Sequence, residues 1–234
     1  VNSKIYMVSM IVGLFTVATL VNGFGIKPSA TMSIVSAIVG TIIPMLVIIV
    51  MGAIWVFKHQ VIAIDVSINS WLPHTSMANN AAFFVIVMFS VFGLEMSATH
   101  AESVKNPERN YPKALLISTI FIVITLIFSS LAIAIIVPSK DLSLIAGLDQ
   151  AFKFFLESTH LSFLLPFIII AIIIGSFGSM SAWVIGPTKG LMVAAEDGAL
   201  PKFFSYQNRL NSPVVILIFQ AIIVFLLCGF FAGI

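Results

Sequence analysis

The sequence predicts an all-α integral membrane protein with about six transmembrane helices, because a spanning helix needs about 20 mostly apolar residues. Of the 234 residues, 60% are hydrophobic and only 9% are charged, and the mean hydropathy is +1.15. Soluble domains carry roughly 25% charged residues, so a soluble fold of this size would lack the polar side chains to cover its surface. The alternating apolar pattern of membrane β-strands is absent from the sequence, which favours helices.

The apolar segments that are long enough for such helices follow one another along the whole chain. They are Ile5–Val21, Ile34–Val56, Ala81–Thr99, Ala114–Val137, Leu161–Ile185 and Val214–Ile234. Between the fourth and fifth segments, Asp141–Glu157 has apolar residues at near-helical spacing, which is typical of an amphipathic helix at the membrane interface. After the fifth segment the helix is expected to continue to Asp197, where Gly198 and Pro201 form a stop signal.

The connectors between these segments differ in charge. Seven of the 11 Lys and Arg residues follow the first, third and fifth segments, and the other four lie on the opposite side. The positive-inside rule therefore places the connectors His100–Lys113 and Thr188–Pro213 in the cytoplasm. No linker separates two domains, so we expect residues 1–234 to form a single transmembrane domain. Val1 is not an initiator methionine and Ile234 ends an apolar run, so we expect an excerpt of a longer protein.

The third segment contains Glu95, the only acidic residue inside a predicted span. A charge at the bilayer centre costs roughly 2.5–3.5 kcal/mol on insertion scales, so such a residue usually has a function or a partner. Gly93 lies about 200° around a regular helix from Glu95, so the two face one cavity only if the helix unwinds near Gly93. Transporters build substrate sites from such broken helices. The alternative is a regular helix in which Glu95 reaches water or pairs with a neighbour.

Small residues recur on the second and fifth segments at helical spacing, which predicts close helix contacts. They are Ser33, Ser36, Ala37, Gly40 and Thr41, followed by Pro44, and Ala171, Gly175, Ser179, Ala182 and Gly186. Pro44 also predicts a kink. Trp183 lies one helical turn from Ser179, well inside its span. It is either the aromatic wall of a ligand site, with cation–π potential toward an ammonium group, or a core-filling side chain.

Other classes of function lack support in the sequence. A net charge of +2 without a basic run gives no nucleic-acid surface. Cys228 is the only cysteine, and no metal-ligand spacing, nucleotide fingerprint or nucleophile elbow is present. We therefore expect no enzyme, no catalytic residue, no metal and no cofactor.

Two blocks of the sequence carry a recognisable pattern. Gly93–His100, with Asn106–Pro112 after it, resembles the sixth helix and the following loop of the amino acid–polyamine–organocation transporter superfamily. Its Ser-Ala-Thr-His ending is similar to the bacterial glutamate/GABA antiporters. Ala182–Gly190, with Ala195–Pro201 after it, is similar to the eighth helix and its cytoplasmic extension.

This resemblance implies a partial LeuT/APC-type bundle, covering helices four to nine of about twelve in a five-plus-five inverted repeat. The first and sixth helices of that fold are broken at the substrate. The residues implied in substrate binding are Phe89, Ser90, Phe92, Gly93 and Trp183. Glu95 is implied as a gating and pH-sensing residue beside the break. Ser179 stands where glutamate/GABA antiporters carry an acidic residue.

The resemblance further implies a secondary active transporter that exchanges glutamate for GABA across the bacterial inner membrane by alternating access, with a role in acid resistance. Its partners would be the two amino acids and the lipid bilayer. Two alternatives stay open: an amino acid permease of other specificity, such as a proton-coupled importer, and a non-transporting scaffold or channel subunit. A channel should show a re-entrant filter or a ring of like charges, and the sequence shows neither. The oligomeric state and the coupling ion stay open.

Overall fold

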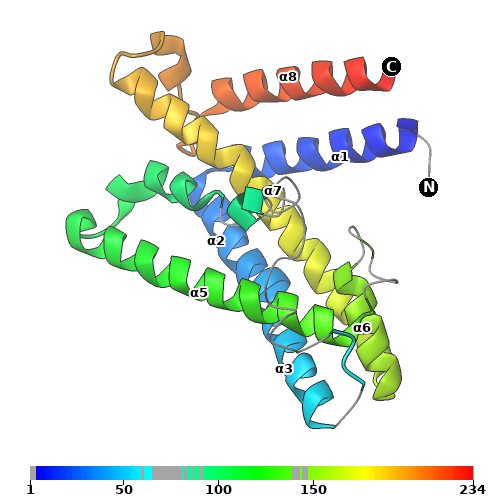
Figure 1. The fold of residues 1–234 in the computed structure, drawn as a ribbon. Coiled ribbons are helices and arrows are strands. Elements are labelled where there is room, and N and C mark those ends of the chain that lie inside the picture. The colour runs from blue at the N-terminus through cyan, green and yellow to red at the C-terminus, as the bar shows by residue number, and fades with distance from the viewer. Residues whose placement is uncertain are drawn as a thin grey trace. The chain divides into compact units, whose positions relative to one another are not determined.

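The computed structural model describes residues 4–58, 61–64, 81, 84–85, 87–89, 92–138, 143 and 147–233. Five helices in this part of the chain are long and apolar enough to cross a membrane (Figure 1). They are Lys4–Gly23, Pro28–Phe57, Pro107–Ile136, Ser162–Glu196 and Val214–Gly233. They confirm the predicted helical membrane bundle for five of its spans. The remaining predicted span, residues 81–99, falls partly outside the described residues.

The chain packs as two compact units. The first unit comprises Val1–Thr41 and Ile172–Ile234, and the second comprises Ile42–Ala171. The single transmembrane domain over residues 1–234 stays a prediction.

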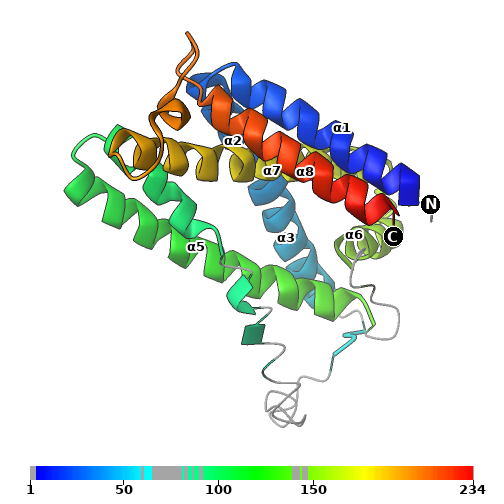
Figure 2. The ribbon, with the colours of Figure 1, turned by 90° about the horizontal axis from the view of Figure 1, so that it is seen from above.

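The first unit contains α1 (Lys4–Gly23), α2 (Ile26–Ala37), most of α7 (Leu165–Glu196) and α8 (Val214–Gly233). Helices α1 and α8 run side by side, as Figures 1 and 2 show from two directions. Ala18, Val184 and Leu217 are buried between α1, α7 and α8. Because lipid is as apolar as these side chains, close packing rather than the hydrophobic effect holds such helices together.

A buried polar cluster fixes the end of α1 in the first unit. The Asn22 side-chain amide donates hydrogen bonds to the backbone oxygen and the hydroxyl of Ser181, at 3.1 and 3.0 Å. The Ser212 hydroxyl donates to the Asn22 carbonyl at 2.7 Å, and the Asn208 amide donates to the Gly23 carbonyl at 2.8 Å. The last two bonds satisfy carbonyl groups that have no partner inside the helix at its C-terminus. Together the four bonds tie α1 to α7 and to the loop before α8.

Helices α2 and α3 (Ile43–Phe57) are joined by a π-helical segment, Ile38–Ile42. Pro44, the second residue of α3, has no N–H to donate to the carbonyl of Gly40, and its ring crowds that carbonyl. A π-helical turn widens the helix at such a point. The structure shows a π-helical segment just before Pro44, and the predicted kink stays a prediction.

Within the first unit, α2 crosses α7 at small residues. A Cβ atom added to Gly175 would overlap the Gly40 carbonyl group and lie 2.7 Å from the Gly40 Cα. A Cβ atom added to Gly178 would overlap the Ser36 side chain. The predicted contact roles of Ser36, Gly40 and Gly175 are confirmed. Gly178 was not among the predicted contact residues, whereas Ser179, which was, is exposed.

The second unit contains α3, a 3₁₀ helix (Leu94–Ser103), α5 (Pro107–Ile136) and α6 (Gly147–Ser158). Helices α3 and α5 approach closely where a Cβ atom on Gly52 would lie 2.6 Å from the Ala132 Cβ. The amphipathic helix α6 buries Phe152 and Phe155, and the Phe155 ring lies 6.2 Å from the Trp55 ring. This confirms the predicted amphipathic helix from Gly147 onward. Ser143, which falls in the predicted range, is not helical, and residues 141–142 and 144–146 lie outside the described part.

The C-terminal end of α7 confirms the predicted stop. Gly198 adopts a left-handed conformation with φ of 85°. Its N–H donates to the Ala195 carbonyl at 3.2 Å, and the Ala199 N–H donates to the Ala194 carbonyl at 2.9 Å. This pair of bonds is a Schellman motif, in which glycine supplies the left-handed residue that ends the helix.

Candidate functional site

The third predicted span is interrupted at Gly93. Residues 84–85 and 87–89 are helical, and the Phe92 N–H donates to the Phe89 carbonyl at 3.2 Å in a turn. Gly93 then has φ of 104° and ψ of −10°, a left-handed conformation that only glycine adopts at no steric cost. The predicted discontinuity is therefore confirmed at Gly93. Ser90 and Val91, which belong to the predicted broken segment, lie outside the described residues.

The carboxylate of Glu95 closes this interruption. The Gly93 N–H donates to Glu95 Oε2 at 2.9 Å, and the Met96 N–H donates to the Gly93 carbonyl at 3.1 Å. The first N–H groups of a helix have no partner within the helix and attract negative charge. Glu95 supplies that charge from its own first turn, and its side chain is otherwise exposed. The alternative of a regular helix through Gly93 and Glu95 does not hold in this structure.

The helix after the interruption is wound as a 3₁₀ helix over ten residues, Leu94–Ser103. Runs longer than 3–4 residues are uncommon for this helix type, and a long run often marks a hinge. Two side chains add hydrogen bonds to its own backbone. Ser97 Oγ donates to the Leu94 carbonyl at 2.7 Å, and Thr99 Oγ1 donates to the Met96 carbonyl at 2.8 Å.

A tight turn leads from this 3₁₀ helix into α5. Asn106 takes a left-handed conformation with φ of 52°, and Pro107 is the first residue of α5. Proline suits that position because its φ angle is already helical and its missing N–H would have had no partner. The turn brings Tyr111 beside the 3₁₀ helix, where its hydroxyl lies 2.9 Å from Ser97 Oγ.

A cavity of about 420 Å³ lies beside this contact in the second unit. It is lined by Gly93, Leu94, Ser97, Val104, Tyr111, Ala114, Leu115 and Ser118. Gly93 is the one predicted site residue in this lining. Phe89 and Phe92 are exposed on either side of the turn, with ring centroids 5.7 Å apart.

Trp183 belongs to the first unit, whereas Phe89, Phe92, Gly93 and Glu95 belong to the second. It lies in the middle of α7 and 43% of its surface is exposed, while the next two residues, Val184 and Ile185, are buried. Trp183 therefore lies on the face of α7 opposite to the packed core of its unit. Ser179, one turn earlier, is exposed as well.

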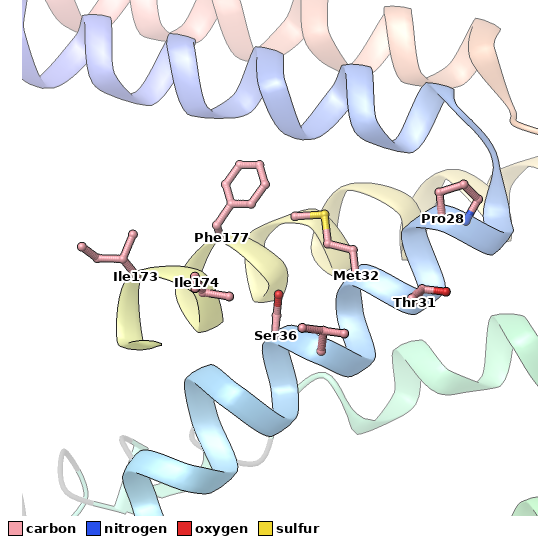
Figure 3. A pocket seen from close by; sticks show the side chains of 8 residues that line it. Pro28, Thr31, Met32, Ser36, Ile173, Ile174 and Phe177 are labelled. Atoms are coloured by element: carbon pink, nitrogen blue, oxygen red, sulfur yellow. The ribbon is translucent and has the colours of Figure 1, made fainter. Parts of the chain in front are cut away.

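A second cavity, of about 840 Å³, lies between α2 and α7 of the first unit (Figure 3). It is lined by Pro28, Thr31, Met32, Val35, Ser36, Ile173, Ile174 and Phe177. None of the predicted site residues takes part in this lining. Apolar side chains dominate it, so it offers few partners for the charged groups of an amino acid. Among the described residues, no group of three or more His, Cys, Asp or Glu side chains could hold a metal ion.

Comparison with known proteins gives consistent matches over the chain. A family model described as amino acid permease matches residues 1–234. An uncharacterized transporter of Legionella pneumophila is 46% identical over 95% of this chain and 48% of its own length. A glutamate/gamma-aminobutyrate antiporter of Lactococcus lactis is 33% identical over 80% of this chain and 38% of its own length. A putrescine transporter of Haemophilus influenzae is 30% identical over 85% of this chain and 44% of its own length. The chain spans about half the length of these relatives, or less.

Proposed function

Because this chain belongs to the amino acid permease family, we propose that the full-length protein is a secondary active antiporter that exchanges glutamate for GABA by alternating access. Family membership and the apolar helices identify the chain as part of a multi-pass bacterial inner-membrane protein. The named relatives are transporters and not enzymes. The choice of glutamate and GABA is supported by the relative from Lactococcus lactis, whose printed name states that pair.

The observation that carries this proposal is the interruption at Gly93 beside the Glu95 carboxylate. Unwound backbone inside a membrane is tolerated only where it is buried in protein or lines a water-filled cavity. Transporters use the N–H and C=O groups of such breaks to bind the charged groups of a substrate. At Gly93 a substrate carboxylate would have to displace Glu95 from the backbone N–H. In this proposal Phe89, Ser90, Phe92 and Gly93 line the broken segment, Trp183 forms an aromatic wall, and Glu95 gates the site in response to pH.

The chemistry of the two amino acids fits such a site. Glutamate and GABA each carry an ammonium group and a carboxylate at opposite ends of a short flexible chain. A carboxylate is stabilised by backbone N–H groups at a helix start, and an ammonium group is stabilised by an aromatic face. Glutamate has one further carboxylate, so discrimination between the two depends on the charge near the break.

Counterflow in liposomes tests the proposal. Liposomes that contain the full-length protein and are loaded with GABA are expected to take up labelled glutamate well above the level of unloaded liposomes. The reverse experiment, with glutamate inside and labelled GABA outside, should give the same result. Loading with putrescine serves as the competing specificity, because a putrescine transporter is also a relative. Uptake that only putrescine supports, or uptake that loading does not change, would contradict glutamate/GABA exchange.

The substitution Trp183→Leu is expected to lower the exchange rate about five- to tenfold with normal amounts of protein in the membrane. Leucine keeps the apolar bulk but removes the ring face, and a cation–π contact is worth about 1 kcal/mol. The measurement is initial uptake by proteoliposomes, normalised to the protein incorporated. Trp183→Phe, which retains an aromatic face, should keep most of the rate. Equal rates for the leucine variant and the wild type would make Trp183 a packing residue.

A further inference from the structure

We propose that the hydrogen bond between Tyr111 and Ser97 positions the segment that follows the Gly93 interruption, which makes Tyr111 a positioning residue of the transport cycle. The inference rests on the proposed function only for its consequence in transport. Its structural part concerns α5 and the 3₁₀ helix, and it can be tested without any substrate.

The direction of the hydrogen bonds follows from the number of protons available. Ser97 Oγ donates its single proton to the Leu94 carbonyl at 2.7 Å. A serine hydroxyl has one proton to donate, so in the 2.9 Å contact with Tyr111 the serine oxygen accepts and the tyrosine O–H donates. The result is a relay from Tyr111 through Ser97 to Leu94, which is the first residue after Gly93.

The relay connects α5, a long and well-packed helix, to the less regular 3₁₀ helix. Helix α5 has 30 residues and packs against α3 where Gly52 meets Ala132. Its first turn is fixed by the bond from the Asn110 N–H to the Asn106 carbonyl at 3.0 Å. The 3₁₀ helix, by contrast, has the weaker hydrogen-bond geometry of its type.

The cavity beside the relay explains why a single hydrogen bond can control the position of the 3₁₀ helix. Ser97 and Tyr111 both line the space of about 420 Å³. Close packing therefore does not hold the 3₁₀ helix against α5 at this point, and the segment has room to move once the bond opens. A neutral hydrogen bond of this kind is expected to shift the balance between held and released positions about fivefold, which corresponds to about 1 kcal/mol.

Hydrogen exchange of the backbone amides in Leu94–Ser103 tests the structural part in purified full-length protein. The variants Tyr111→Phe and Ser97→Ala each remove one hydroxyl of the relay. Each is expected to speed exchange in this segment about fivefold, and the double variant should be no faster than the faster single one. Ser118→Ala is the matched control because Ser118 lines the same cavity without a bond to Tyr111. Tyr206→Phe controls for loss of an exposed tyrosine hydroxyl.

Counterflow by the same variants tests the functional part. We expect Tyr111→Phe to change the maximal exchange rate several-fold while the KM for external substrate stays within about twofold, since the relay does not touch the substrate. Unchanged hydrogen exchange in both relay variants, relative to Ser118→Ala, would contradict the proposal that the Tyr111–Ser97 bond holds this segment in position. Faster hydrogen exchange with wild-type transport kinetics would overturn the positioning role. Absence of glutamate/GABA exchange in the wild type would instead contradict the proposed substrates. The hydrogen-exchange result would still decide whether the Tyr111–Ser97 bond holds the segment.

Discussion

Replacing Gly175 with valine is expected to prevent the protein from accumulating in the membrane. A Cβ atom at this position would overlap the Gly40 carbonyl group, which belongs to the π-helical segment and cannot rotate away as a side chain could. The helices α2 and α7 would have to separate, and the close contact between their backbones would be lost. Overpacking of a well-packed contact costs typically 1–3 kcal/mol, and we expect at least about 3 kcal/mol here because backbone meets backbone.

A neighbouring glycine offers a matched comparison, because it distinguishes overlap with backbone from overlap with a side chain as the cause of the loss of stability. At Gly178 the obstacle is the Ser36 side chain rather than backbone. Gly178→Ala alone should therefore destabilise the protein, and Ser36→Gly in the same protein should recover most of the loss. The equivalent rescue is impossible at Gly175, since Gly40 has no side chain to remove.

The measurements are the amount of protein in the membrane fraction and its thermal unfolding in detergent. Gly13→Val serves as the control, because nothing among the described residues lies within 4 Å of a Cβ atom at Gly13. Normal accumulation and unfolding of Gly175→Val would show that α2 and α7 do not cross at this contact in the membrane.

The sequence predicted the spans well because the bilayer leaves few choices for an apolar chain. Backbone groups in lipid must be paired within the segment, so hydropathy alone locates helices such as Lys4–Gly23 and Val214–Gly233. The interruption at Gly93 was predictable for a related reason. A glycine is the residue that permits a left-handed turn, and the angle between Gly93 and Glu95 on a regular helix predicted a break if both residues were to face one cavity.

Features that depend on contacts between distant residues were not predictable from local patterns. Gly178 lies outside the small-residue stripe that the spacing suggested, and its role follows from where α2 happens to cross α7. The hydrogen bond between Ser97 and Tyr111 depends on the turn at Asn106, which sets how α5 lies beside the 3₁₀ helix. No sequence pattern signalled this pair, although Tyr111 lies in the loop block that carries the family resemblance.

Glu95 illustrates how far the sequence predicts the candidate site itself. Its position in an apolar span indicated either a functional carboxylate or one that reaches water or pairs with a neighbour. The structure shows a partner two residues away, the N–H of Gly93, which is accessible only because Gly93 leaves the helical conformation. The local bond and the interruption therefore depend on each other.

That mutual dependence leads to the expected behaviour of Glu95→Gln. The variant is expected to lose most of the pH dependence of exchange and to transport at neutral pH as the wild type does at acidic pH. An ionised carboxylate accepts a backbone hydrogen bond about twice as strongly as a neutral group, and it also offsets the positive end of the helix dipole. Protonation of Glu95 would therefore loosen the closure at Gly93, and glutamine imitates the protonated group with almost no change of shape.

The change alters transport only if the outward-open and inward-open states differ in how tightly the break is closed, because equal proton affinity in the two states shifts nothing. A difference of about 1 kcal/mol between the charged and neutral acceptor would give about a fivefold effect on the balance of states. The measurement is the rate of glutamate/GABA counterflow against pH in proteoliposomes. Glu108→Gln is the matched control, since Glu108 is an exposed glutamate in the first turn of α5. A Glu95→Gln curve that overlays the wild type would reject the gating role, and a variant that fails to accumulate while Glu108→Gln accumulates normally would show that the carboxylate chiefly stabilises the turn at Gly93.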